Sequence, residues 1–314
     1  MNLLISFSGG ETSAMMTYRL LQDHSLNGFY RYSPFDKALV VFANTGEENE
    51  QTLEFVRDCD REFGFQTVWV EAVVHHGERT ASTHRVVTFD TASRHGEPYE
   101  EVIKKYGIPN TSFPHCTREL KENPIYSYTK SIGWENDTFN VAIGIRADES
   151  KRRDKRAHIK GLLYPMCDWG VTKRDVNTFW SKQPFRLRLT WYQGNCKWCW
   201  KKSDRKLLTI MDETPDKFLF PERMEQTYGQ VGAEFKKEPL PGYAQRTFFR
   251  GHKTVQDLRD LHRRGDWEHA KDDSLDIDDG CVESCEIEWR DFGASNTSDP
   301  SLDAPVAVAD REEE

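Results

Sequence analysis

The sequence predicts an α/β fold: a Rossmann-like parallel sheet with helices on both faces, followed by a mainly helical C-terminal region and an acidic tail. Residues 3–8, 38–43 and 67–74 are largely apolar runs of strand length. Residues 12–22 and 49–63, which separate these runs, carry apolar side chains at helical spacing. Strands without polar alternation are buried on both faces, which is typical of parallel sheets covered by helices.

Each element of the first half has its own signal. The first strand, residues 3–8, leads into a helix over 12–22 whose apolar positions recur on one face. The second strand ends at the turn residues 44–46. The helix that follows begins at Asn49, a candidate N-cap, and stops at Gly64.

The second half of the chain is less regular. Residues 75–97 are polar with few periodic features, so we expect a long loop there, of the kind that often serves as a functional lid. The remaining predictions are helices over 99–106, 120–131, 171–182 and 204–212, a strand over 139–145, and mainly helical structure with Pro and Gly breaks over 215–271.

Charge separates the end of the chain from the rest. The net charge of −9 conceals an acidic end, because residues 272–314 carry 15 Asp and Glu against two basic residues and leave +4 for the rest. We expect this end to be a partly disordered, solubilising tail rather than a nucleic-acid mimic or an autoinhibitory arm. The predicted organisation is an α/β domain over 1–210, a helical extension over 211–271 and a Cys-containing acidic tail over 272–314.

Hydropathy and cysteine count indicate the compartment. No apolar run approaches the roughly 20 residues that span a bilayer. Residues 1–6 lack the basic region of a secretory signal. Seven cysteines, an odd number, argue against a disulfide framework. We therefore expect a cytoplasmic protein that does not enter membranes.

The strongest functional signal is Ser8-Gly9-Gly10-Glu11-Thr12-Ser13, a turn between the first strand and its helix. Glycines let main-chain N–H groups approach an anion, and the helix N-terminus adds partial positive charge. The alternative is a tight turn capped by Thr12 or Ser13. Ligands of parallel sheets bind at the carboxyl ends of the strands, and this position favours a phosphate-binding loop.

Four segments in order resemble a known family. Ser-Gly-Gly-Glu-Thr-Ser is similar to the PP-loop, Ser-Gly-Gly-x-Asp-Ser, of the HUP-type adenine nucleotide α-hydrolase superfamily. The segments 44–47 (Asn-Thr-Gly-Glu), 116–124 (Cys-Thr-Arg-Glu-Leu-Lys, then Pro) and 144–150 (Gly-Ile-Arg-Ala-Asp-Glu-Ser) resemble motifs of its phosphoadenosine phosphosulfate (PAPS) reductase branch, including PAPS reductase-like phage proteins. Thr12 stands where the PP-loop has Asp, Thr117 replaces a second Cys, and no Cys-Gly-x-His follows near the C-terminus.

This resemblance implies an adenine-nucleotide site whose ligand is PAPS, adenylyl sulfate or ATP. Mg²⁺ is a further candidate ligand, bound together with ATP. Catalytic roles fall on Cys116, Lys121 and Arg146, the two cations stabilising charge that develops in the transition state. We expect the basic run over 151–160 to be a solvated surface rather than a binding site for phosphate groups. The nucleotide would be held by Ser6, Ser8, Gly9, Gly10, Thr12, Ser13, Phe42, Asn44, Thr45, Gly46 and Gly144.

A second candidate site is formed by cysteines. Cys196 and Cys199 form a Cys-x-x-Cys turn, and two thiols at this spacing can bind the same metal or cluster. The family resemblance implies that Cys116 lies close to them in space. A [4Fe–4S] cluster, zinc and plain thiols all stay open, since spacing alone does not identify a metal. Cys285, Cys281 or His115 are candidate fourth ligands. Two further cysteines, Cys59 and Cys167, are expected to be packed thiols, and Trp191, Trp198 and Trp200 to pack in the core.

Two reactions fit these motifs. The first is reduction of a sulfonucleotide, in which a thiolate attacks sulfur and a thiol reductant supplies electrons. The second is ATP-driven adenylation followed by sulfur transfer from a donor protein to a nucleic acid or a small molecule. We favour the first because the motifs are closest to the reductase branch. The alternative from another class is a non-catalytic nucleotide-binding or host-interaction protein, in the host cytoplasm if the chain is phage-encoded.

Overall fold

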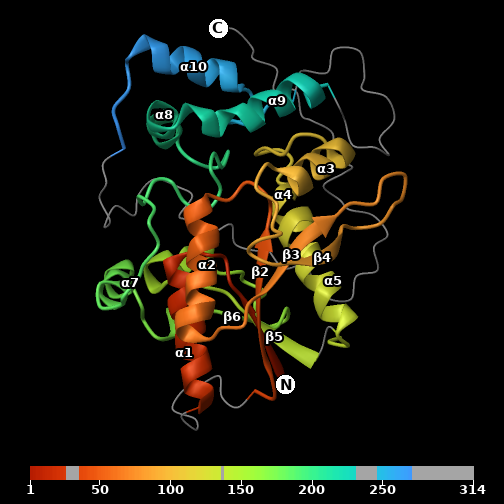
Figure 1. Cartoon of the computed structure of the whole chain (residues 1–314), viewed down its shortest axis with the longest axis vertical. Helices are drawn as coiled ribbons and strands as arrows, with labels where there is room; N and C mark the ends of the chain where they lie inside the picture. The colour runs from red at the N-terminus through yellow and green to blue at the C-terminus, as the bar shows by residue number, and fades with distance from the viewer. Residues whose placement is uncertain (26–34, 136–137, 231–245, 271–314) are drawn as a thin grey trace, which may run out of the picture.

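The computed structural model describes residues 1–25, 35–135, 138–230 and 246–270 (Figure 1). Its centre is a six-stranded sheet in the order β4-β3-β2-β1-β5-β6. All neighbouring pairs are parallel except β3 and β4, which are antiparallel. The strands are β1 (Asn2–Ser6), β2 (Ala38–Asn44), β3 (Val68–Val73), β4 (Thr83–Val87), β5 (Phe139–Ala142) and β6 (Leu162–Leu163).

Helices cover both faces of the sheet, as the apolar strands predict (Figure 1). On one face, α1 (Glu11–Ser25), α2 (Glu50–Phe63) and α7 (Lys173–Trp180) pack with side chains of β1, β2 and β3. On the other face, α5 (Asn123–Ser131) packs against the alternate side chains of the same strands. The predicted α/β fold with a mainly parallel sheet is therefore confirmed.

The order of the strands reverses at β1. The chain runs from β1 outward through β2 and β3, then returns to add β5 on the other side of β1. Such a reversal opens a crevice at the carboxyl end of the central strands, where ligands of α/β sheets bind. The Ser-Gly-Gly turn follows β1 at this point.

The expectation of a loop throughout residues 75–97 was wrong. β4 (Thr83–Val87) lies within this segment as the antiparallel edge strand, and α3 (Glu97–Tyr106) begins at its end. β4 escaped detection because its first residues, Thr-His-Arg, are polar and partly exposed, as an edge strand allows. The short strand β6 was also missed, and β5 is shorter than the predicted 139–145.

The helix predicted over 120–131 begins earlier. α4 (His115–Thr117) continues through a π-helical segment, η1 (Arg118–Glu122), into α5. A π-helical segment inserts extra residues per turn and is frequent at functional sites. Cys116 and Lys121 are thus carried by one continuous helical stretch.

The C-terminal helices lie beyond the carboxyl end of the sheet (Figure 1). They share one hydrophobic core with α3, with Cys116 and with Trp198 and Trp200. Because of this shared core, the wall around Cys116 depends on packing from the end of the described chain. These helices are α8 (Asp204–Glu213), η4 (Pro215–Phe218), α9 (Leu219–Tyr228) and α10 (Val255–Arg264); α6 (Pro165–Asp168) and the 3₁₀ segment η3 (Ala147–Arg152) follow β5 earlier in the chain.

Candidate functional site

The Ser-Gly-Gly turn joins β1 to α1 as predicted. Gly9 has φ of 81°, and a Cβ there would lie 2.7 Å from the Cγ2 atom of Thr52. This left-handed conformation and close approach require glycine. Gly10 is partly exposed and a Cβ on it would meet nothing closer than 3.7 Å. Gly9 therefore shapes the turn, whereas a side chain at Gly10 would make only ordinary van der Waals contacts, with Asn195 and Ser8.

The hydroxyls of the turn bind one another. The Oγ atoms of Ser8 and Ser13 are 2.9 Å apart, and Ser13 Oγ donates to the carbonyl of Gly10 at 3.0 Å. Gly144, after β5, lies against Ser13, since its Cβ would be 3.0 Å from Ser13 Cα. Ser6, also predicted to bind nucleotide, is the last residue of β1 and pairs with β2. These contacts fix the turn between two strands.

Arg146 reaches the same turn but carries its own counter-charges. Its side chain is 3% exposed and its Nη1 donates to Thr12 Oγ1 at 3.3 Å. Its Nε and Nη2 pair with Asp148 at 3.0 Å and Glu149 at 3.4 Å. Arg146 is thus next to the turn, as predicted, and its charge is largely balanced by the buried Glu149 and the half-buried Asp148.

The segment after β2 holds itself together. The Nδ2 atom of Asn44 donates to Glu71 Oε1 at 2.6 Å, and Gly46 N donates to Asn44 Oδ1 at 3.2 Å. Thr45 donates to Glu48 Oε2 from both its N–H and its hydroxyl. The side chain of Phe42, another predicted ligand residue, packs in the core against Trp69. Any contact of this segment with adenosine therefore falls to its main chain.

This segment also anchors the cysteine-bearing loop at residues 194–200. Asn49 donates from Nδ2 to the carbonyl of Gly194 at 2.8 Å and from its main-chain N–H to the carbonyl of Asn195 at 2.9 Å. Lys197 N donates to the carbonyl of Glu47 at 2.9 Å. In return, Asn195 Nδ2 donates to the carbonyl of Ser8 at 2.7 Å. Neither asparagine was assigned to the site from the sequence, because only long-range contacts reveal them.

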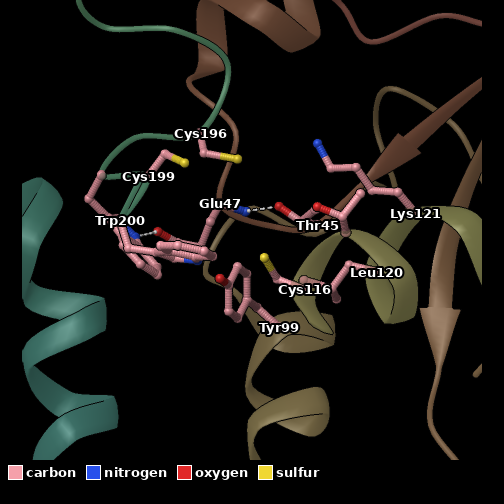
Figure 2. Close-up of a pocket in the computed structure, with 11 residues that line it drawn as sticks. Thr45, Glu47, Tyr99, Cys116, Leu120, Lys121, Cys196, Cys199 and Trp200 are labelled. Atoms are coloured by element: carbon pink, nitrogen blue, oxygen red, sulfur yellow. Dashed lines mark hydrogen bonds between the residues drawn. The ribbon is translucent and has the colours of Figure 1, made fainter. Parts of the chain in front are cut away.

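Three thiols line one cavity (Figure 2). Cys196 and Cys199 come from the 194–200 loop and Cys116 from α4, with its sulfur pointing towards them (Figure 2). The sequence-based expectation that these cysteines approach one another is supported by this arrangement. The other lining residues are Thr45, Glu47, Tyr99, Thr117, Leu120, Lys121, Trp198 and Trp200.

The cavity is narrow and mostly apolar in its walls. It encloses about 20 Å³, which is room for about one water molecule. An adenosine group therefore does not fit inside it, and the residues of the Ser-Gly-Gly turn are not among those that line it. The hydroxyl of Thr117 is buried and lacks a hydrogen-bond partner among the described residues.

Two carboxylates and a lysine surround the thiols. Lys121 Nζ lies 3.7 Å from Glu48 Oε1, and the Cys196 thiol lies 4.0 Å from the same oxygen. Glu47 accepts a hydrogen bond from Trp198 Nε1 at 2.6 Å (Figure 2). Burial raises the pKa of Glu47 to about 7, although Lys197 opposes the shift. The cavity thus contains a carboxyl group that changes protonation near neutral pH.

The donor set suits a soft metal or cluster, because three cysteine sulfurs face one space and thiolates select zinc or iron–sulfur centres. Within the described ranges, however, no three Cys, His, Asp or Glu side chains converge closely enough to hold a metal ion. A metal would need the thiols to move together. Cys285 and Cys281, two candidate fourth ligands, lie outside the described residues.

The third candidate ligand, His115, points elsewhere. Its Nε2 lies 3.1 Å from the carbonyl of Gly107, and His115 is not among the residues lining the cavity. Burial lowers its pKa to about 4. His115 therefore supports the start of α4 and is not a ligand in this arrangement.

The remaining thiols pack as expected. Cys59 is fully buried on α2, where burial raises the pKa of its thiol. Cys167 is half-buried and donates to the carbonyls of Ile145 and Arg146. Trp191 lies outside the cavity, under Lys206 Nζ at 4.2 Å from the ring centre.

Part of the basic run over 151–160 is paired with acids. Arg152 pairs with Glu149 at 2.7 Å, and Lys160 with Asp154 at 2.8 Å. Residues 151–153, 155 and 156 are exposed, as a solvated surface predicts, whereas Lys160 is buried. Among the described helices there is none with the length and apolar character that a membrane span needs.

Comparisons with known proteins give relatives whose roles are not described by their names. The chain is 28% identical over 293 residues, 90% of its length and 94% of the relative's, to an uncharacterized nin region protein, ORF290, of Escherichia phage lambda. It is 27% identical over 196 residues to an uncharacterized protein, MJ0066, of Methanocaldococcus jannaschii, covering 58% of this chain and 32% of the archaeal one. No protein-family model matches the sequence.

Proposed function

We propose that this protein binds an adenine nucleotide at the Ser8–Ser13 turn and uses the thiols of Cys116, Cys196 and Cys199 for sulfur chemistry, as a PAPS reductase-like enzyme. The observation that carries the proposal is the contact between the two regions. Asn195, next to Cys196, donates to the carbonyl of Ser8. The thiol loop and the glycine-rich turn therefore form one continuous structure.

The turn supplies what an anionic group needs. It stands at the topological switch of the sheet and at the N-terminus of α1, a helix of 15 residues. Main-chain N–H groups and the helix dipole favour a phosphate or sulfate there. Gly10 is partly exposed and has no side chain to cover its main chain, so an anion can approach the turn from this side. Arg146 braces the turn through Thr12 and adds only a partly neutralised charge.

The thiols suit reduction of a sulfonucleotide. A thiolate attacks the sulfate sulfur, the bond from sulfur to the phosphate oxygen breaks, and the nucleotide leaves as a phosphate. A second thiolate then attacks the S-sulfonated cysteine, which releases sulfite and leaves a disulfide. Sulfur gains two electrons and two thiols lose them, so an external thiol reductant must restore the pair. Cys196, the more exposed of the loop pair, is the nucleophile we favour, with Cys199 resolving it.

The third thiol favours a second candidate, an ATP-dependent sulfurtransferase. Reduction consumes two thiols, whereas Cys116 gives the cavity a third. If the thiols moved together, these three residues would hold a [4Fe–4S] cluster or zinc, and a cluster would supply redox and sulfur-binding chemistry. Thr117, whose buried hydroxyl has no hydrogen-bond partner among the described residues, also lines this cavity. The sulfur acceptor would be a nucleic acid or a small molecule.

Nucleotide binding and turnover test the two candidates together. Purified protein is titrated with PAPS, adenylyl sulfate and ATP by calorimetry, and sulfite, pyrophosphate and AMP are then assayed with and without dithiothreitol. We expect saturable binding and release of sulfite from PAPS. Cys196→Ser should lose product while keeping binding, whereas Cys167→Ser, a matched change at a half-buried thiol outside the cavity, should keep both. Release of AMP and pyrophosphate from ATP would favour the sulfurtransferase.

Two outcomes would redirect the proposal. Tight binding without turnover under reducing conditions would indicate a non-catalytic nucleotide-binding or host-interaction protein. Absence of binding for all three nucleotides would overturn it. Metal content after anaerobic purification separates iron–sulfur from zinc and from plain thiols.

The similarity to a phage protein leads us to propose the host cytoplasm as the place of action.

A further inference from the structure

One side chain bridges the two halves of the candidate site. The Nδ2 atom of Asn195 donates to the carbonyl of Ser8 at 2.7 Å across 187 residues of sequence. Asn195 is 5% exposed, so this hydrogen bond is sheltered from water. Its Oδ1 atom lies 3.7 Å from the Cβ position of Gly10. The amide thus lies against the same turn that we propose as the phosphate site.

The main chain of Asn195 is fixed on its other side. Its carbonyl accepts from Asn49 N at 2.9 Å and from Asn49 Nδ2 at 3.3 Å. The next residue, Cys196, forms a bridge with Glu48. A shift of the Ser8 carbonyl therefore acts on a segment that is already tied to the thiol cavity.

We infer that Asn195 is a positioning residue that couples occupancy of the Ser8–Ser13 turn to the order of the thiol loop, residues 194–200. The inference rests on the proposed function. An anion on the turn fixes the Ser8 peptide and strengthens its hydrogen bond with Asn195. The thiol loop then opens less often. Nucleotide binding would thus assemble the cavity before its thiols react.

The coupling has a thermodynamic consequence. If the nucleotide stabilises the ordered loop, the ordered loop binds the nucleotide more tightly by the same factor. Coupling between sites in proteins is typically about fivefold or more. Removing the amide of Asn195 should therefore weaken nucleotide binding moderately and abolish its effect on the loop.

Hydrogen–deuterium exchange of the full-length protein tests this inference. Exchange in peptides covering 194–200 is followed with and without saturating PAPS or, in a separate arm, ATP. We expect the nucleotide to slow exchange by about fivefold or more in wild type. Asn195→Ala should lose this slowing at saturation. Gln193→Ala is the matched control, since Gln193 immediately precedes the loop and is half-buried, and its main-chain N–H donates to the carbonyl of Thr190 and not to the glycine-rich turn.

The outcomes are separable from those of the proposed function. If neither nucleotide binds wild type, the proposed function fails and this inference with it. If a nucleotide binds and slows the loop equally in Asn195→Ala, the loop is shielded directly and only the inference is overturned. Peptides over 3–7 report whether Asn195→Ala stays folded. If it does not, Asn195→Leu, which keeps a similar side-chain shape and removes the N–H donor without adding a charge, decides with the same criterion.

Discussion

At the residue scale, Gly9 and Gly64 share a left-handed backbone but differ in their surroundings. A Cβ on Gly9 would lie 2.7 Å from Thr52, whereas a Cβ on Gly64 would meet nothing within 4 Å. Gly64→Ala should therefore cost only the backbone penalty, about 1–2 kcal/mol. Gly9→Ala should cost a further 1–3 kcal/mol or so because the methyl group overpacks the core. Urea denaturation measures both, and equal losses would contradict the tight approach at Gly9.

The raised pKa of Glu47 predicts how the stability of the protein changes with pH. Burial raises its pKa from 4.5 to about 7, so the folded protein binds this proton more tightly than the unfolded chain does. The resulting stabilisation is complete below pH 4.5 and is lost as pH rises to 7. Glu47→Gln removes this dependence and keeps an acceptor for Trp198. As pH rises from 4.5 to 7, the free energy of unfolding of the variant should therefore increase relative to that of wild type, by on the order of 3 kcal/mol.

Stability of both proteins measured across pH 4.5–8 checks this prediction. Glu225 also has its pKa raised to about 7 by burial, so the slope of wild type alone is not diagnostic. The difference between Glu47→Gln and wild type cancels the Glu225 contribution. A difference that stays constant with pH would mean that Glu47 is charged in the folded protein.

At the element scale, the N-terminus of α2 is used for a distant contact. The sequence predicts Asn49 as an N-cap, and Asn49 does occupy that position. Its side chain donates to the carbonyls of Gly194 and Asn195 and does not cap the helix. The local sequence pattern predicts the boundary of the helix, but it does not predict a hydrogen-bond partner 145 residues away.

This contact of Asn49 predicts that two different substitutions lower stability by a similar amount. Asn49→Ala should cost about 1–3 kcal/mol, because the buried carbonyl of Gly194 loses its donor. Asn49→Ser offers a good N-cap oxygen but cannot replace the amide, so we expect a similar loss. Chemical denaturation of both variants is the measurement. Recovery of wild-type stability by the serine would show that Asn49 acts as an ordinary cap.

Strands differed in how well the sequence predicted them. β1, β2 and β3 are buried on both faces, so their apolar runs stand out. β4 carries Arg85, which binds the buried carboxylate of Glu71 on β3. That pairing makes a polar strand possible, and it depends on tertiary contact rather than on hydrophobic pattern. β6 is too short for any periodicity to appear.

At the scale of the whole molecule, the order of strands and helices brings the predicted motifs to one end of the sheet. The turn after β1 and the segment after β2 meet there because parallel neighbours end on the same edge. The approach of Cys116 to the thiol loop came from the family resemblance, and the cavity agrees with it. The tie between loop and turn through Asn49 and Asn195 could not be predicted, since neither belongs to a motif that the resemblance supplied.

The central claim is that the glycine-rich turn holds the anionic part of an adenine nucleotide, and Gly10 tests it most directly. Gly10→Ala adds a methyl group that meets no atom closer than 3.7 Å, so the fold should tolerate it. The methyl group would still occupy the space through which an anion reaches the main-chain N–H groups.

The measurement is calorimetric titration of wild type and Gly10→Ala with PAPS and ATP, alongside their thermal unfolding. We predict that wild type binds, and that Gly10→Ala binds about tenfold more weakly or worse with little change in melting temperature. Equal affinity in the two proteins, or no binding heat in wild type, would contradict the account.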